Sequence, residues 1–155
     1  MRDPLNQRQT YLRNLPLFGG VNLDACRLLA QAAETILLED GATLYRAGET
    51  ANAVFILYAG RVRLEQNEVI LYELGEGDHL GDMEFFDMAA RGCTVRAQGD
   101  CEIWQIPFVA LDHLRRNDLK AFALITMNAA RQLSRRLREV DLERCHLHDR
   151  LEQGA

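Results

Sequence analysis

A glycine, two acidic residues and an arginine lie within one stretch, residues 77–97, at a spacing that suits the binding of an anion. Gly81 has no side chain, so a ligand can approach its backbone closely. Asp82 to Phe86 predict a short helical turn, and the free N–H groups at its start attract an anion. Arg91, ten residues after Gly81, carries a planar guanidinium that can contact two phosphate oxygens at once. The stretch therefore predicts a phosphate-binding loop, which ends in a strand at Thr94–Ala97.

No residue pattern of metal-dependent or covalent catalysis accompanies this loop. The one His-x-His pair, His146 and His148, lies in a predicted helix that points the two rings in different directions. The loop lacks the lysine of a P-loop, and no nucleophile stands beside a base. His79 is interpreted as a half-buried strand histidine in preference to a haem ligand. We expect neither catalysis nor a bound metal.

Composition and charge restrict the remaining classes. The chain has 155 residues, 48% of them hydrophobic, which suits one domain with a sizeable core. A net charge of −5 argues against a nucleic-acid-binding surface. No apolar run is long enough to span a membrane, and the N-terminus lacks the apolar segment of a signal peptide. Four scattered cysteines suit a reducing compartment. We expect a cytoplasmic protein.

Three segments must position the loop. Residues 1–33 predict a helical segment, with a first helix at 1–14 and a second helix capped by Asn22. Residues 34–107 alternate short apolar runs with turn residues, among them Gly60 and Gly99-Asp100, which predicts an antiparallel β-roll or jelly roll. The predicted strands are Thr35–Leu38, Ala42–Tyr45, Ala53–Ala59, Arg61–Gln66, Val69–Leu74, Thr94–Ala97 and Cys101–Ile106.

Residues 108–155 predict two helices. Phe108–Arg116 forms the first, and Asn117-Asp118 ends it and caps the next. From Leu119 to about Leu151 the chain contains neither Gly nor Pro, which predicts one long helix. An apolar stripe with three- and four-residue spacing predicts that residues 118–151 pair with a second copy. Its members are Ala130, Leu133, Leu137, Val140, Leu147 and Leu151. The fold class is therefore α+β, with a β-roll between N-terminal helices and a long C-terminal helix.

The order glycine, acid, hydrophobic residue, ending in Arg91-Gly-Cys-Thr94-Val, resembles the phosphate-binding cassette of the cyclic-nucleotide-binding domain family. The resemblance extends from about Leu15 to the end of the chain. It implies that Gly81 lies against the cyclic phosphate and that Asp82 holds the ribose 2′-hydroxyl. Arg91 and the Cys93 backbone N–H would contact the phosphate. The implied ligand-binding set is Gly81, Asp82, Met83, Glu84, Arg91, Gly92, Cys93, Thr94, Leu64, Leu71, Leu74 and Arg136.

The resemblance also implies a ligand and partners. Cyclic AMP is the default ligand and cyclic GMP stays open, because some relatives use a hydroxyl near Thr94 to favour guanine. In dimeric relatives the long helix pairs with its twin and closes over the base; here Arg136 is near that position, although it is also an ordinary surface arginine. The chain stops at Ala155 without a winged helix-turn-helix, so we expect no direct DNA binding. The downstream protein partner stays unknown.

Two residues depart from the family pattern. Asp82 stands where the family usually has glutamate, and Glu84 where it has a small residue. Glu84 could pair with Arg91 and occupy the phosphate site. The alternative function is therefore an interaction or dimerisation module that kept the fold and lost its ligand. An Arg91–Glu84 ion pair would favour this alternative, whereas an anion on Arg91 would favour the sensor.

Overall fold

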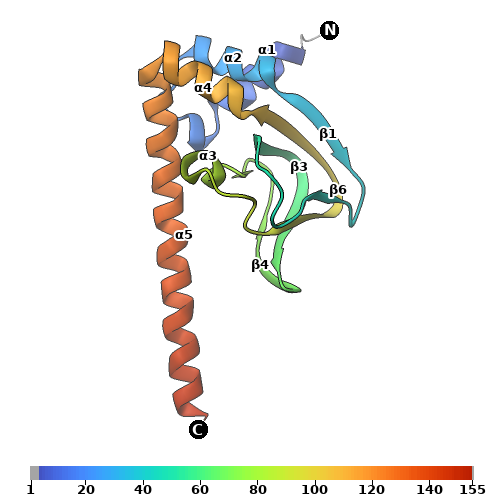
Figure 1. Ribbon diagram of the computed structural model, residues 1–155, viewed down its shortest axis with the longest axis vertical. Helices are drawn as coiled ribbons and strands as arrows, with labels where there is room; N and C mark the ends of the chain where they lie inside the picture. Colours follow the sequence, from blue (N-terminus) through green and yellow to red (C-terminus); the bar gives the residue numbers. More distant parts are fainter. Residues whose placement is uncertain (1–3, 155) are drawn as a thin grey trace.

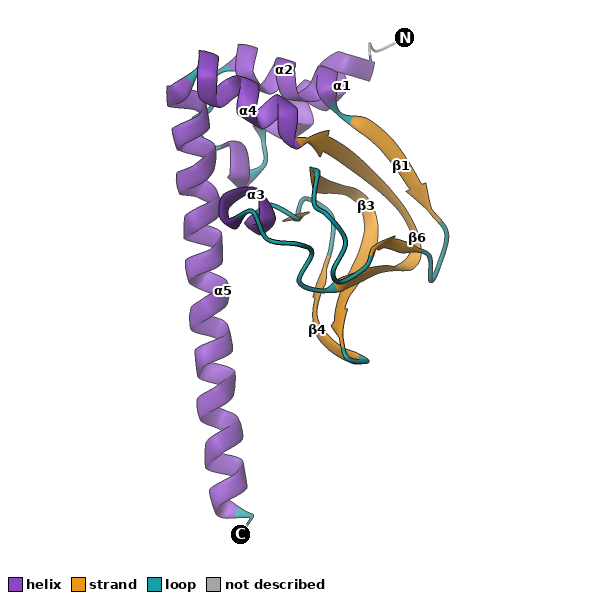
Figure 2. Ribbon diagram, in the orientation of Figure 1, coloured by secondary structure: helices purple, strands orange, loops and turns teal. Residues whose placement is uncertain are grey.

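The computed structural model describes residues 4–154 and shows an antiparallel β-roll with helices at one end and one long helix along its side. In Figure 1, α1, α2 and α4 gather over one end of the sheet, and α5 runs from there past α3 to the far C-terminus. The predicted α+β class is confirmed. Figure 2 shows that helices and strands form separate layers. Positions 1–3 of the first predicted helix lie outside the described residues.

The N-terminal segment forms a helical cap over the sheet. It consists of α1 (Pro4–Arg13), the 3-10 helix η1 (Pro16–Phe18) and α2 (Leu23–Ala32). The Asn22 side chain accepts a hydrogen bond from the Ala25 N–H at 2.8 Å, as expected for the N-cap of α2. Buried apolar residues of these helices pack with α4, α5 and one face of the sheet in a single core cluster.

Residues 4–154 contain six strands, which form the roll, and all their pairings are antiparallel. The long strand β6 pairs with β1, β2 and β3, and β3 pairs in turn with β4 and β5. A second apolar cluster fills the inside of the roll. The strands are β1 (Glu34–Leu38), β2 (Thr43–Tyr45), β3 (Ala53–Gln66), β4 (Val69–Leu74), β5 (His79–Leu80) and β6 (Thr94–Pro107).

The strand predictions were wrong at two glycines. Gly60 and Gly99 were expected to separate strands, but β3 and β6 continue through them. Gly60 has φ +93° and lies where the β3–β6 register shifts. A Cβ added there would lie 2.6 Å from the Asp100 carbonyl oxygen. Glycine therefore serves a bulge and a close backbone approach here, not a chain reversal. The predicted ranges also omit β5.

The C-terminal helices agree with prediction. Helix α4 spans Phe108–Asn117, and α5 spans Leu119–Gln153, 35 residues that reach about 50 Å. The Asp118 side chain caps α5 by accepting from the Ala121 N–H at 3.1 Å. Asn128, buried in α5, donates to the Leu17 and Gly19 carbonyls, each at 3.0 Å, and so fixes this part of α5 to the N-terminal cap.

Candidate functional site

The loop between β5 and β6 begins with the predicted glycine and short helix. Helix α3 covers Met83–Asp87 and follows Gly81-Asp82 directly. Gly81 has φ +82°, and a Cβ there would lie 2.6 Å from Arg91 Nη1 and 3.1 Å from the Ala53 carbonyl oxygen. Only glycine meets both conditions without strain. The group that approaches Gly81 most closely in this structure is therefore the Arg91 guanidinium.

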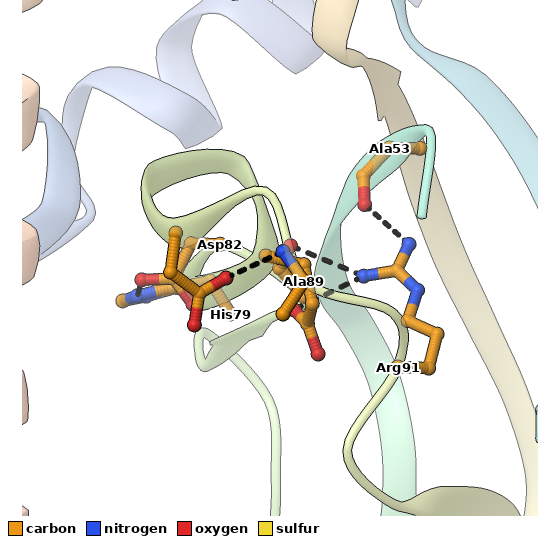
Figure 3. A network of polar contacts seen from close by, with 8 residues as sticks. Ala53, His79, Asp82, Ala89 and Arg91 are labelled. Atoms are coloured by element: carbon orange, nitrogen blue, oxygen red, sulfur yellow. Dashed lines mark hydrogen bonds and ion pairs between the residues drawn. The ribbon is translucent and has the colours of Figure 1, made fainter. Parts of the chain in front are cut away.

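Arg91 is only 3% exposed, and its guanidinium is held by backbone and aromatic groups. Nη1 donates to the Gly81 carbonyl at 3.1 Å, and Nη2 donates to the Ala53 carbonyl at 2.7 Å (Figure 3). The guanidinium carbon lies 4.4 Å from the Tyr45 ring centre and 5.3 Å from that of Phe55, within cation–π range. Nε is buried and has no hydrogen-bond partner within the described part of the chain, residues 4–154. Buried donors are rarely left so, and an anion oxygen would satisfy this one.

Glu84 completes the surroundings of this arginine. Its Oε2 lies 3.3 Å from Arg91 Nη1, and its side chain is 11% exposed. The ion pair that would favour the alternative function is thus present. Glu84 holds a position on the guanidinium that a phosphate would need, so a phosphate on Nη1 requires Glu84 to turn away.

Asp82 is buried beside His79, at the start of α3 (Figure 3). Asp82 Oδ2 lies 3.1 Å from His79 Nε2. Burial by itself would raise the pKa of this carboxyl, but the hydrogen bond and charge of His79, with Arg136 adding to them, bring the pKa below its usual value. Asp82 therefore stays ionised. His79 is fully buried in β5, where half-burial was expected.

The cassette, β4 and α5 enclose a cavity of about 260 Å³. Nine of the twelve predicted ligand-binding residues line it: Leu64, Leu71, Gly81, Asp82, Met83, Glu84, Gly92, Cys93 and Arg136. Sequence reasoning missed Tyr45, Tyr72 and Leu80, which also line it. Tyr72 could have been found as the cross-strand partner of Leu64. The cavity is apolar and aromatic on the β4 side and polar at the cassette.

The other three predicted residues lie apart from this lining. Arg91 sits beside Gly81, as described. Leu74 is buried in the core inside the roll, opposite Val62 of β3, and also lines the neighbouring groove between β4 and α5. The Thr94 hydroxyl accepts a hydrogen bond from the Ala47 N–H at 3.1 Å.

Two further side chains define the cavity's chemistry. The Arg136 guanidinium carbon lies 5.3 Å from the Tyr72 ring centre, so α5 contacts β4 through this pair. Burial, followed by the Glu84 charge, raises the pKa of the Cys93 thiol, which is therefore neutral. Among residues 4–154, no group of three or more His, Cys, Asp or Glu side chains could hold a metal ion. Within the same range no helix is long and apolar enough to cross a bilayer.

The residues present fit a nucleotide monophosphate under one condition. The apolar wall of Leu64, Leu71 and Tyr72 suits a base, and Asp82 offers a carboxylate to sugar hydroxyls. Arg91 contacts Gly81 and Glu84 of the lining, and its buried Nε has no hydrogen-bond partner among residues 4–154. The condition is the rotation of Glu84 away from the guanidinium.

Comparisons with known proteins agree with this geometry. The sequence profile of the cyclic nucleotide-binding domain matches residues 35–118. An uncharacterized NTE family protein of Mycobacterium tuberculosis is 29% identical over 132 residues, which are 84% of this chain and 22% of that protein. The cyclic AMP receptor protein of Thermus thermophilus is 28% identical over 137 residues, 85% of this chain and 62% of that protein. The chain thus spans less than two thirds of the length of these relatives.

A solved structure shows the same fold. The regulatory domain of Toxoplasma gondii PKA, crystallised with cAMP, superposes with a TM-score of 0.70 at 18% identity, covering 83% of this chain and 50% of that one. The profile match covers more than half of the sequence. The chain therefore belongs to the cyclic nucleotide-binding domain family.

Proposed function

We propose that this chain is a cytoplasmic, non-catalytic sensor of a cyclic nucleotide, with cyclic AMP preferred, that reports ligand state through α5. The observation that carries the proposal is the cavity in which cassette residues, the β4 wall and Arg136 of α5 meet. The Thermus relative is a cyclic AMP receptor protein, and the Toxoplasma domain was crystallised with cAMP. Both support cyclic AMP as the ligand. Thr94 lies outside the cavity lining, which disfavours its use for guanine. The four cysteines are free, as suits a reducing compartment.

Each part of the site has a task in this proposal. Gly81 and the first N–H groups of α3 would accommodate the phosphate, and Arg91 would balance its charge. Asp82 would accept from the ribose hydroxyl. Arg136 makes α5 part of the cavity wall, so a ligand that moves Arg136 or Tyr72 shifts the preferred position of α5.

We also propose that two copies pair through the distal part of α5. The apolar stripe is exposed there: Leu137 is 62% exposed and Leu151 is 73% exposed. In a parallel pair with this heptad register, Arg136 would face Asp141 of the second copy, an attractive contact. Light scattering at tens of micromolar tests the pairing. We expect a dimer mass that Leu137→Asp reduces to the monomer mass; a monomer mass for the unaltered chain would contradict it.

One observation favours a second function. The Arg91–Glu84 ion pair balances the charge of the arginine without an anion, as expected of an interaction module that no longer binds a ligand. Two other observations favour the sensor: Arg91 Nε has no partner among the residues that the structure describes, and the cavity is open. The two functions differ in whether the isolated domain binds a nucleotide at all.

Calorimetric titration of nucleotide-free protein with cyclic AMP and cyclic GMP separates them. The matched variants are Arg91→Lys, which loses the planar guanidinium, and Arg61→Lys, a surface control that pairs with Glu73. Micromolar binding that Arg91→Lys abolishes and Arg61→Lys preserves would establish the sensor. Absence of heat and of thermal stabilisation at millimolar nucleotide would instead establish the interaction module.

A further inference from the structure

His79 is a buried histidine for which the family resemblance assigns no role. It lies in β5, is 4% exposed, and is fixed by the pairing of β5 with Ile56 of β3. Its Nε2 lies 3.1 Å from Asp82 Oδ2, and no other side chain of residues 4–154 hydrogen-bonds to this carboxylate. The ring therefore sets the direction of the Asp82 side chain.

The contact leaves part of the carboxylate for a ligand. Asp82 lines the cavity, and only its Oδ2 bonds to His79. Nε2–H donates to Oδ2 in the imidazolium form and in one neutral tautomer. Oδ1 remains able to accept from a sugar hydroxyl, while His79 keeps the carboxylate from rotating away.

The charge of His79 also reaches the cavity. Histidine is the side chain that changes charge between about pH 5 and 8. The groups that face the pair are Arg136 from α5, Tyr72 from β4 and Glu84 from α3. With a neutral His79, the charges of Asp82 and Glu84 are balanced by those of Arg136 and Arg91. An imidazolium would add a net positive charge beside the cavity, which favours an anionic ligand.

We propose that His79 is a positioning residue of the nucleotide site, which orients Asp82 toward the ribose and makes affinity for the anionic ligand increase on acidification. This inference rests on the proposed function. The cyclic phosphodiester keeps a single negative charge through the relevant range, so the pH dependence comes from the protein. One charge at the edge of a partly solvated cavity changes the affinity about threefold to tenfold.

The test is calorimetric titration with cyclic AMP at about pH 5.5, 6.5 and 8. The variant His79→Gln retains an amide donor and cannot become charged. The control His113→Gln alters an exposed histidine of α4. We expect the unaltered protein and the control to bind about threefold to tenfold more tightly at the lowest pH than at the highest. His79→Gln should bind with one affinity throughout.

Each other result overturns the inference. Equal pH profiles for the unaltered protein and His79→Gln would assign the titration to another group. A uniform loss of affinity in His79→Gln with the profile retained would make His79 merely structural. Absence of binding by the unaltered protein at every pH would refute the proposed function as well, and so differs from a failure of this inference alone.

Discussion

Removing the charge of Glu84 should strengthen nucleotide binding. The carboxylate lies 3.3 Å from Arg91 Nη1, on the guanidinium that would hold the phosphate. Two negative charges that share this arginine at a separation of about 7 Å repel by about 2 kcal/mol at an effective dielectric constant of about 20. That energy corresponds to about a 30-fold change in Kd. Rotation of Glu84 into solvent relieves part of it, so we expect Glu84→Gln to lower Kd for cyclic AMP by about tenfold to 30-fold.

The same substitution should weaken the nucleotide-free fold. Arg91 is 3% exposed, and the loss of its charged partner leaves a buried cation with fewer contacts. We expect a loss of about 1–3 kcal/mol in the free energy of unfolding. Thermal melts would therefore show a lower Tm without nucleotide and a larger rise with it.

Calorimetry and thermal melts of three proteins check both effects. Glu84→Asp is the matched control, since it retains the charge on a side chain one methylene shorter. We expect its affinity to stay close to that of the unaltered protein. Unchanged or weaker binding by a folded Glu84→Gln protein would refute the view that Glu84 competes with the phosphate.

Three further substitutions test the geometry. Gly81→Ala places a Cβ 2.6 Å from Arg91 Nη1 at φ +82°, so chemical denaturation should show a loss of about 2–4 kcal/mol, together with loss of binding. Asn128→Ala removes two hydrogen bonds from α5 to the cap, one buried and one partly buried, and should lose about 1–3 kcal/mol of stability. The control Asn117→Ala, at an exposed position, should lose less than about 0.5 kcal/mol. The pKa of Asp82 is lower in the folded protein than the ordinary value of 3.8. Its carboxylate therefore stabilises the fold above pH 3.8, and this stabilisation is lost as the pH falls below 3.8. Acid unfolding of Asp82→Asn should lack this component, and an identical acid limb would contradict the assignment.

Local signals in the sequence predicted the helices and failed at the bulges. Asn22 and Asp118 cap their helices through hydrogen bonds to residues three positions later, so the neighbouring sequence contained the whole interaction. Gly60 serves a bulge because the Asp100 carbonyl lies against it, forty residues away. A turn and a bulge require the same residue type. Only the tertiary contact distinguishes them.

The candidate site divides in the same way. The order from Gly81 to Arg91 was informative because one loop builds the close approach between those two residues. The cavity residues that lie on strands were harder to predict. The bulge between Leu64 and Glu65 decides which β4 residues face the cavity. Tyr45 belongs to a strand of only three residues, and its place beside Arg91 depends on the pairing of β2 with β6.

Helix α3 lies between Arg91 and the helices α4 and α5. Glu84, on one side of this helix, contacts Arg91, while the next residue, Phe85, packs edge-on against Phe108 of α4 at 5.1 Å and Phe122 of α5 at 6.1 Å. A cavity of only about 20 Å³ remains where Asp82 and Phe85 meet buried residues of η1 and α5. Glu84 and Phe85 also line an open groove of about 520 Å³, so Glu84 has space into which it can turn. We predict that its release from Arg91 moves α3, and with it the contacts of Phe85 with Phe108 and Phe122.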